Sequence, residues 1–140
     1  MRLSQASSTI AIHAPADAIW RVIGDFGTAG QYLAGVVHCT VEGVGVGARR
    51  TLTSADGSTI VERLETLDET AQRLSYVLLT DTPFHNCLTT VTVRDLGPGQ
   101  AELTWSATFE PDGLPESETA ELMESVLAAN CVALKQLLEG

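Results

Sequence analysis

Residues 101–139, AELTWSATFEPDGLPESETAELMESVLAANCVALKQLLE, join a strand pattern to a long helix pattern. In the first ten residues every second side chain is apolar, as in a strand with one buried face: Leu103, Trp105, Ala107 and Phe109. After Pro115, residues 116–139 form one uninterrupted helical pattern with an acidic start. Both apolar faces are buried if the helix lies across a sheet to which the strand belongs.

The rest of the chain supplies the other strands of that sheet. Two short helices are predicted after the first strand, one beginning near Pro15 and one around residues 29–33. Strand patterns separated by turn signals cover residues 8–14, 36–44, 47–54, 59–67, 73–80 and 86–95. This order predicts an α+β fold, in which a curved seven-stranded antiparallel sheet wraps around the long C-terminal helix. No linker or repeat interrupts residues 1–140, so we expect a single domain.

Composition narrows the range of partners. The formal net charge of -10 argues against nucleic acid and against anionic membrane surfaces, both of which attract basic patches. The first residues lack the apolar core of a signal peptide, so we expect a cytoplasmic protein, either a monomer or a weak homodimer. The cysteines Cys39, Cys87 and Cys131 show no metal-ligand spacing, and we expect buried free thiols, no metal and no cofactor.

Three polar residues fall on faces that are otherwise apolar. Strand alternation turns Arg50 and Glu62 toward the concave side of the sheet. On the long helix Leu122, Val126 and Asn130 share a face that we expect to contact the sheet. Two interpretations remain open: Arg50 and Glu62 pair while Asn130 caps a backbone group, or the three hold a ligand or water in a cavity.

Several stretches resemble the START/SRPBCC superfamily, which includes birch-pollen-allergen proteins, bacterial polyketide cyclases and plant abscisic acid receptors. The resemblance is carried by residues 31–42 (QYLAGVVHCTVE), by residues 62–68 (ERLETLD) and by Asn130. It implies a helix-grip fold in which Glu62 and Asn130 organise water around a ligand. Leu33 stands where the receptors anchor the hormone carboxylate with lysine, and residues 54–58 and 82–86 depart from their gate and latch. A hormone-receptor function is therefore not expected.

Together, the alternation and the resemblance predict binding of a hydrophobic or aromatic small molecule between the sheet and the helix. Leu33 predicts that acidic ligands bind poorly. The alternatives are a cofactor-free polyketide cyclase or dehydratase, with Glu62, His85 and Arg50 as catalytic candidates, and a partner-binding module with a vestigial cavity. The predicted ligand-binding residues are Leu33, Val36, Arg50, Leu52, Ile60, Glu62, Cys87, Thr89, Trp105, Phe109, Leu122, Val126 and Asn130.

Overall fold

The computed structural model describes residues 3–33, 35–80 and 82–140; residues 1 and 2, part of the start from which we expected no signal peptide, lie outside this range. Its described strands form one antiparallel sheet in the order β1-β7-β6-β5-β4-β3-β2. The strands are β1 (Ser4–Ile12), β2 (Val36–Glu42), β3 (Arg49–Ser54), β4 (Thr59–Asp68), β5 (Arg73–Leu78), β6 (Phe84–Gly97) and β7 (Gln100–Pro111). The helices are α1 (Ala16–Ile23), the 3-10 helix η1 (Phe26–Gln31) and α2 (Glu116–Glu139). The predicted α+β class and element order are confirmed.

Most elements agree with their predicted bounds to within two residues, and two differ by more. β1 begins at Ser4 rather than at residue 8, because its backbone pairing with β7 continues to the Ser4–Phe109 pair although the side chains there show little apolar alternation. The second short helix lies at residues 26–31 and not at 29–33. Its start is set by Asp25, whose carboxylate accepts a hydrogen bond from the Gly27 amide at 3.1 Å.

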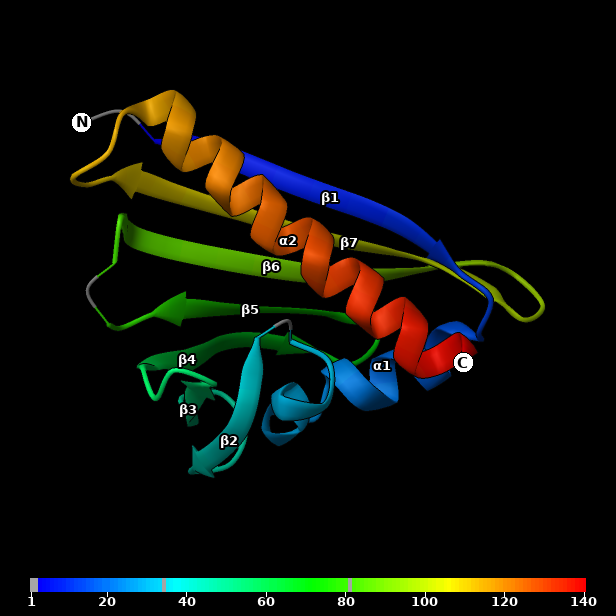
Figure 1. Cartoon of the computed structure of the whole chain (residues 1–140). Helices are drawn as coiled ribbons and strands as arrows, with labels where there is room; N and C mark the ends of the chain where they lie inside the picture. Colours follow the sequence, from blue (N-terminus) through cyan, green and yellow to red (C-terminus); the bar gives the residue numbers. More distant parts are fainter. Residues whose placement is uncertain (1–2, 34, 81) are drawn as a thin grey trace.

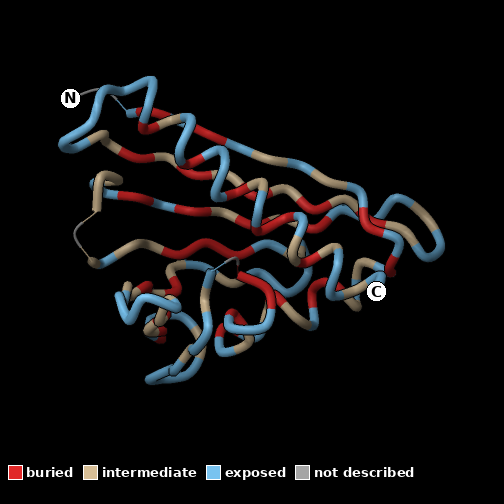
Figure 2. The backbone as a smooth tube through the Cα atoms, viewed as in Figure 1, coloured by how far each residue is buried: buried red, intermediate tan, exposed pale blue. Residues whose placement is uncertain are grey.

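Helix α2 lies diagonally over the concave side of the sheet, and its closest packing is against β1 and β7 (Figure 1). Burial alternates residue by residue along β7 (Figure 2). The other half of the sheet, from β2 to β6, borders a cavity under the middle of α2, around residues 123–130. Helix α2 is thus packed tightly against β1 and β7, and a cavity separates it from the remaining strands.

The buried stripe of α2 is rotated from the one we predicted. Its buried residues are Thr119, Met123, Leu127, Asn130, Cys131 and Leu134. The expectation that Leu122 faces the sheet is wrong, because its side chain is 43% exposed. Val126 is equally exposed and borders the cavity, so it lies at the mouth. Residues 122 and 126 lie one residue, about 100° of helix rotation, from the line through Met123 and Leu127.

Helices α1 and η1 close one end of the sheet. Ile19 and Ile23 on α1 are buried, and the Trp20 indole N–H donates a 2.6 Å hydrogen bond to the Glu69 carboxylate after β4. Phe26 at the start of η1 is buried and reaches the concave face, where its ring lies 4.1 Å from the Arg50 guanidinium carbon. The start of η1 therefore packs directly against Arg50.

Candidate functional site

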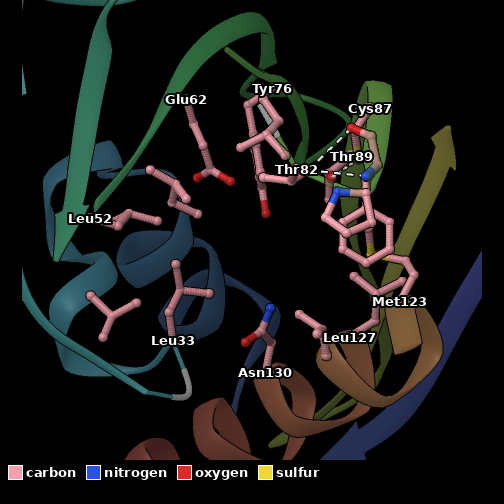
Figure 3. Close-up of a pocket in the computed structure, with 16 residues that line it drawn as sticks. Leu33, Leu52, Glu62, Tyr76, Thr82, Cys87, Thr89, Met123, Leu127 and Asn130 are labelled. Carbon is pink, nitrogen blue, oxygen red and sulfur yellow. Dashed lines mark hydrogen bonds between the residues drawn. The ribbon is translucent and has the colours of Figure 1, made fainter. Parts of the chain in front are cut away.

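A cavity of about 360 Å³ lies between the concave face of the sheet and α2 (Figure 3). This volume falls within the usual range of small-molecule sites. Most of the wall is aliphatic or aromatic, and a few polar groups interrupt it. The lining residues are Leu33, Val36, Leu52, Ile60, Glu62, Tyr76, Leu78, Thr82, Pro83, Phe84, Cys87, Thr89, Met123, Val126, Leu127 and Asn130.

Many residues that the sequence predicted for the site lie on this wall: Leu33, Val36, Leu52, Ile60, Glu62, Cys87, Thr89, Val126 and Asn130. Sequence reasoning missed the lining residues from β5, the β5–β6 connection, the start of β6 and the buried face of α2: Tyr76, Leu78, Thr82, Pro83, Phe84, Met123 and Leu127. A signal for part of this set was present, since alternation in residues 73–80 places Leu74, Tyr76 and Leu78 on one face.

Trp105 and Phe109 do not line the cavity, contrary to prediction, because other aromatic side chains cover them. The Trp105 indole N–H donates a 3.0 Å hydrogen bond to the Tyr76 hydroxyl. The Phe109 ring meets the Phe84 ring edge to face, with centroids 5.4 Å apart. Both predicted residues therefore form a second layer that supports the cavity wall, and Tyr76 and Phe84 supply the surface.

Two further predicted site residues also lie off the wall. His85 is exposed, at a register irregularity where β6 slips against β7 between His85 and Leu88. Leu122 faces outward on α2 and is not a lining residue. The irregularity leaves Asn86 in the left-handed region, at φ 49°, and is followed by the buried, cavity-lining Cys87. Simple alternation along the sequence ignores this irregularity, so it could not predict which side chains at the start of β6 face the cavity.

Arg50 lies behind the wall and pairs with Glu62, which forms part of it. Its Nε donates a 2.8 Å hydrogen bond to Glu62 Oε1. Nη2 lies 2.8 Å from the same oxygen at ion-pair distance, but makes no hydrogen bond to any described residue. Nη1 donates to the Phe26 carbonyl at 3.3 Å, and the guanidinium carbon lies 4.7 Å from the Tyr76 ring centroid. The charge is thus held between two aromatic rings.

Burial and pairing act in opposite directions on this ion pair. Burial raises the pKa of Glu62 above its ordinary value, and the adjacent guanidinium opposes the rise. For Arg50, burial alone would lower the pKa, but Glu62 and the phenol oxygens of Tyr32 and Tyr76 outweigh it and raise the pKa. Arg50 therefore keeps its positive charge. Glu62 is the member of the pair whose carboxyl group lines the cavity.

Beside Glu62, the polar residues of the wall are Tyr76, Thr82, Cys87, Thr89 and Asn130. Burial, followed by the charge of Glu62, raises the pKa of Tyr76, so its hydroxyl stays protonated. Asn130 is 6% exposed and extends from α2 into the cavity opposite Glu62 (Figure 3). Cys87 lies 3.8 Å from the Thr89 hydroxyl, and burial raises the pKa of its thiol to about 11. The wall offers hydrogen-bonding groups but no activated nucleophile.

Comparison with protein families shows which family this chain belongs to. Residues 4–139 match the model of the family described as "Polyketide cyclase / dehydrase and lipid transport". The chain belongs to this family. Among curated proteins, none matches it. Membership in the polyketide cyclase/dehydrase and lipid transport family agrees with the START/SRPBCC resemblance of the sequence.

Solved structures share the helix-grip fold. A START superfamily protein from Mycobacterium smegmatis has a TM-score of 0.83 at 17% identity, covering 96% of this chain and 97% of that one. An uncharacterized Bacillus thuringiensis protein has a TM-score of 0.91 at 23% identity, covering 98% and 100%. Zhui aromatase/cyclase from Streptomyces sp. R1128 has a TM-score of 0.77 at 18% identity, covering 98% and 92%. At these identities the likeness establishes the fold.

The described residues also bear on metal and membrane association. Among them, no group of three or more His, Cys, Asp or Glu side chains could hold a metal ion. None of their helices has the length and apolar character needed to cross a membrane.

Proposed function

We propose that this protein binds a hydrophobic or aromatic small molecule in the cavity between the sheet and α2. The observation that carries the proposal is the wall itself, where Leu33, Leu52, Met123 and Leu127 form a largely apolar lining around about 360 Å³. Family membership supports a role with a lipid-like or polyketide-like ligand. We further propose a cytoplasmic protein of bacterial type that needs no cofactor, metal or nucleic acid and exists as a monomer or weak homodimer.

Binding is tested by titrating the protein with the neutral fluorescent probe N-phenyl-1-naphthylamine. Val126→Trp should place an indole at the cavity mouth and weaken probe affinity roughly tenfold or more, because the opening is filled. Leu137→Trp is the matched control, since Leu137 is 42% exposed on the same helix and does not line the cavity. Absence of probe binding, or equal loss in both variants, would contradict the proposal.

A second candidate is a cofactor-free cyclase or dehydratase. It is favoured by one observation: Glu62 faces the cavity, and burial raises its pKa, the direction that favours a general acid or base. Of the other catalytic candidates, Arg50 lies behind Glu62 and His85 is exposed off the wall. If this candidate is right, Glu62→Gln should abolish turnover of a polyketide-like substrate while probe affinity is retained. Unchanged turnover would exclude Glu62 as the catalytic group.

A further inference from the structure

The Arg50–Glu62 pair uses only one oxygen of its carboxylate. In the common bidentate arrangement an arginine donates to both carboxylate oxygens in parallel. Here both Nε and Nη2 approach Oε1, each at 2.8 Å. Among the described residues, no hydrogen-bond donor reaches Glu62 Oε2. A charged acceptor is therefore left available on the cavity wall, where it needs a donor from whatever occupies the cavity.

Tyr76 lies at the same end of the cavity and offers a hydrogen-bond donor, whereas Glu62 offers an acceptor. Its oxygen already accepts from the Trp105 indole N–H at 3.0 Å, and within the described part of the chain its own O–H has no acceptor. The side chain is 4% exposed and lines the cavity. Tyr76 can therefore donate one hydrogen bond to an occupant, and its raised pKa keeps that proton in place.

Strand pairing brings these two groups together. β4 and β5 are antiparallel, with Glu62 opposite Leu78 and Leu64 opposite Tyr76, so Glu62 and Tyr76 are diagonal neighbours on one face. Figure 3 shows both side chains ending with their oxygens in the cavity, facing Leu33 and Asn130. The polar end of the cavity thus presents one charged acceptor and one neutral donor beside apolar walls.

Functional groups differ in how they satisfy this pair. One hydroxyl oxygen can donate to a carboxylate and accept from a phenol at once. An ether or ketone can only accept, so Glu62 would stay without a donor. A carboxylate would also only accept, and its charge would face the like charge of Glu62. A cationic amine would donate to Glu62 but would lie close to the Arg50 charge.

We propose that the occupant of this cavity is a neutral, largely apolar molecule with a hydroxyl, phenol or enol group that donates to Glu62 and accepts from Tyr76. This inference rests on the proposed ligand-binding function and names the chemical class of its ligand. The hydroxyl end enters first, and the apolar body lies against Leu52, Met123 and Leu127. Glu62 and Tyr76 would then determine specificity, and the remaining wall would determine size.

The test compares four probes of one aromatic skeleton at pH 7: naphthalene, 2-methoxynaphthalene, 2-naphthol and 2-naphthoate. Each displaces N-phenyl-1-naphthylamine from the wild-type protein. We expect 2-naphthol to bind about tenfold or more tightly than 2-methoxynaphthalene, because only naphthol donates to the charged acceptor. We expect 2-naphthoate to bind more weakly than naphthalene. This comparison uses the native protein and does not depend on the folding of any variant.

Variants then assign the effect to its residues. Tyr76→Phe and Glu62→Gln should each reduce the naphthol-to-methoxynaphthalene affinity ratio by about fivefold or more. Glu65→Gln is the matched control, because Glu65 does not line the cavity and pairs with Arg63 at 2.7 Å. This control should leave the ratio unchanged.

The outcomes separate the two proposals. If all four neutral and charged probes displace the dye with equal affinity, the hydroxyl inference is overturned and the apolar binding function stands. If 2-naphthoate binds most tightly, the inference is likewise overturned, and an anion-binding group must lie in the cavity. If neither the dye nor any naphthalene binds, both proposals fail. A naphthol preference that survives Tyr76→Phe and Glu62→Gln would overturn the assignment to these residues.

Discussion

Arg50 is a fully buried charge whose ionic partner is one carboxylate. Its exposed fraction is 1%, and two aromatic rings and a backbone carbonyl surround the rest of the guanidinium. A charge in such a place is tolerated because it is paired, and removing the partner is more harmful than replacing the whole pair. Glu62 therefore has a structural role beside any role in binding.

Glu62→Gln should lower the free energy of unfolding by about 3 kcal/mol, because it leaves Arg50 without its counter-ion. Glu65→Gln should lower it by less than about 1 kcal/mol, since the Arg63–Glu65 pair is about one-third exposed and screened by solvent. Urea denaturation of both variants measures the difference. Equal losses would show that Glu62 is not the buried partner of Arg50.

Cys87 should resist alkylation in the native protein. Burial raises its pKa to about 11, so at pH 8 only about one thiol in a thousand is a thiolate. Burial also raises the pKa of Cys39 and of Cys131. Cys87 and Cys131 are buried as expected, but Cys39 is only half-buried, contrary to the expectation of three buried thiols. A pulse of iodoacetamide followed by mass spectrometry should label Cys87 and Cys131 rapidly in guanidinium and slowly in buffer, and Cys39 should be the fastest of the three in buffer. The native rate should rise with pH through the alkaline range; fast, pH-independent labelling at Cys87 would contradict this assignment.

Local alternation was sufficient to predict some site residues and not others. It placed Arg50 and Glu62 inward on neighbouring strands, and the structure pairs them across β3 and β4. It could not distinguish the surface of the cavity from the layer behind it, because Tyr76 and Trp105 are both inward-facing aromatics. Which of the two lines the space depends on the Trp105–Tyr76 hydrogen bond and the position of α2, which are tertiary facts.

For helix α2 as well, the sequence pattern predicted the element but not which of its apolar residues face the sheet. Its bounds, residues 116–139, were predicted correctly, because Pro115 suits its start and no breaker follows until Gly140. Its buried face was predicted only in part. Val126 and Leu127 are both apolar, so the pattern alone left the rotation of the helix uncertain by about one residue. The buried line through Met123, Leu127, Cys131 and Leu134 is determined by packing against β1 and β7.

Leu134→Ala tests this rotation. Leu134 is fully buried, and its truncation should destabilise the protein by about 3 kcal/mol through lost burial and a residual cavity. Leu122→Ala on the exposed side should cost under about 1 kcal/mol. Thermal or urea unfolding of both variants provides the comparison. A larger loss at Leu122 would restore the face that we originally predicted.

At the scale of the whole molecule, the sheet and α2 should unfold together. Buried residues from α1, η1 and α2 and from six of the described strands form one core cluster, which includes Ile12, Ile23, Leu52, Leu103 and Leu134. We therefore propose that residues 1–140 are one domain, and expect tryptophan fluorescence and far-UV circular dichroism to give the same urea midpoint. The midpoint should not change with EDTA, because no structural metal is expected. Two separate transitions, or a fall on chelation, would contradict this expectation.

The pairing of β1 with β7 has a consequence for synthesis. β1 is made first, yet its hydrogen-bonding partner is the last strand of the chain. During translation the backbone groups of β1 stay hydrogen-bonded to water until residues 100–111 have left the ribosome and can pair with them. Long-range pairing of this kind slows folding, because the entropy of closing the chain is lost before the contact forms. A ribosome stalled before β7 would therefore display an open β7-side edge on β6, a site where chaperones or a second nascent chain can bind.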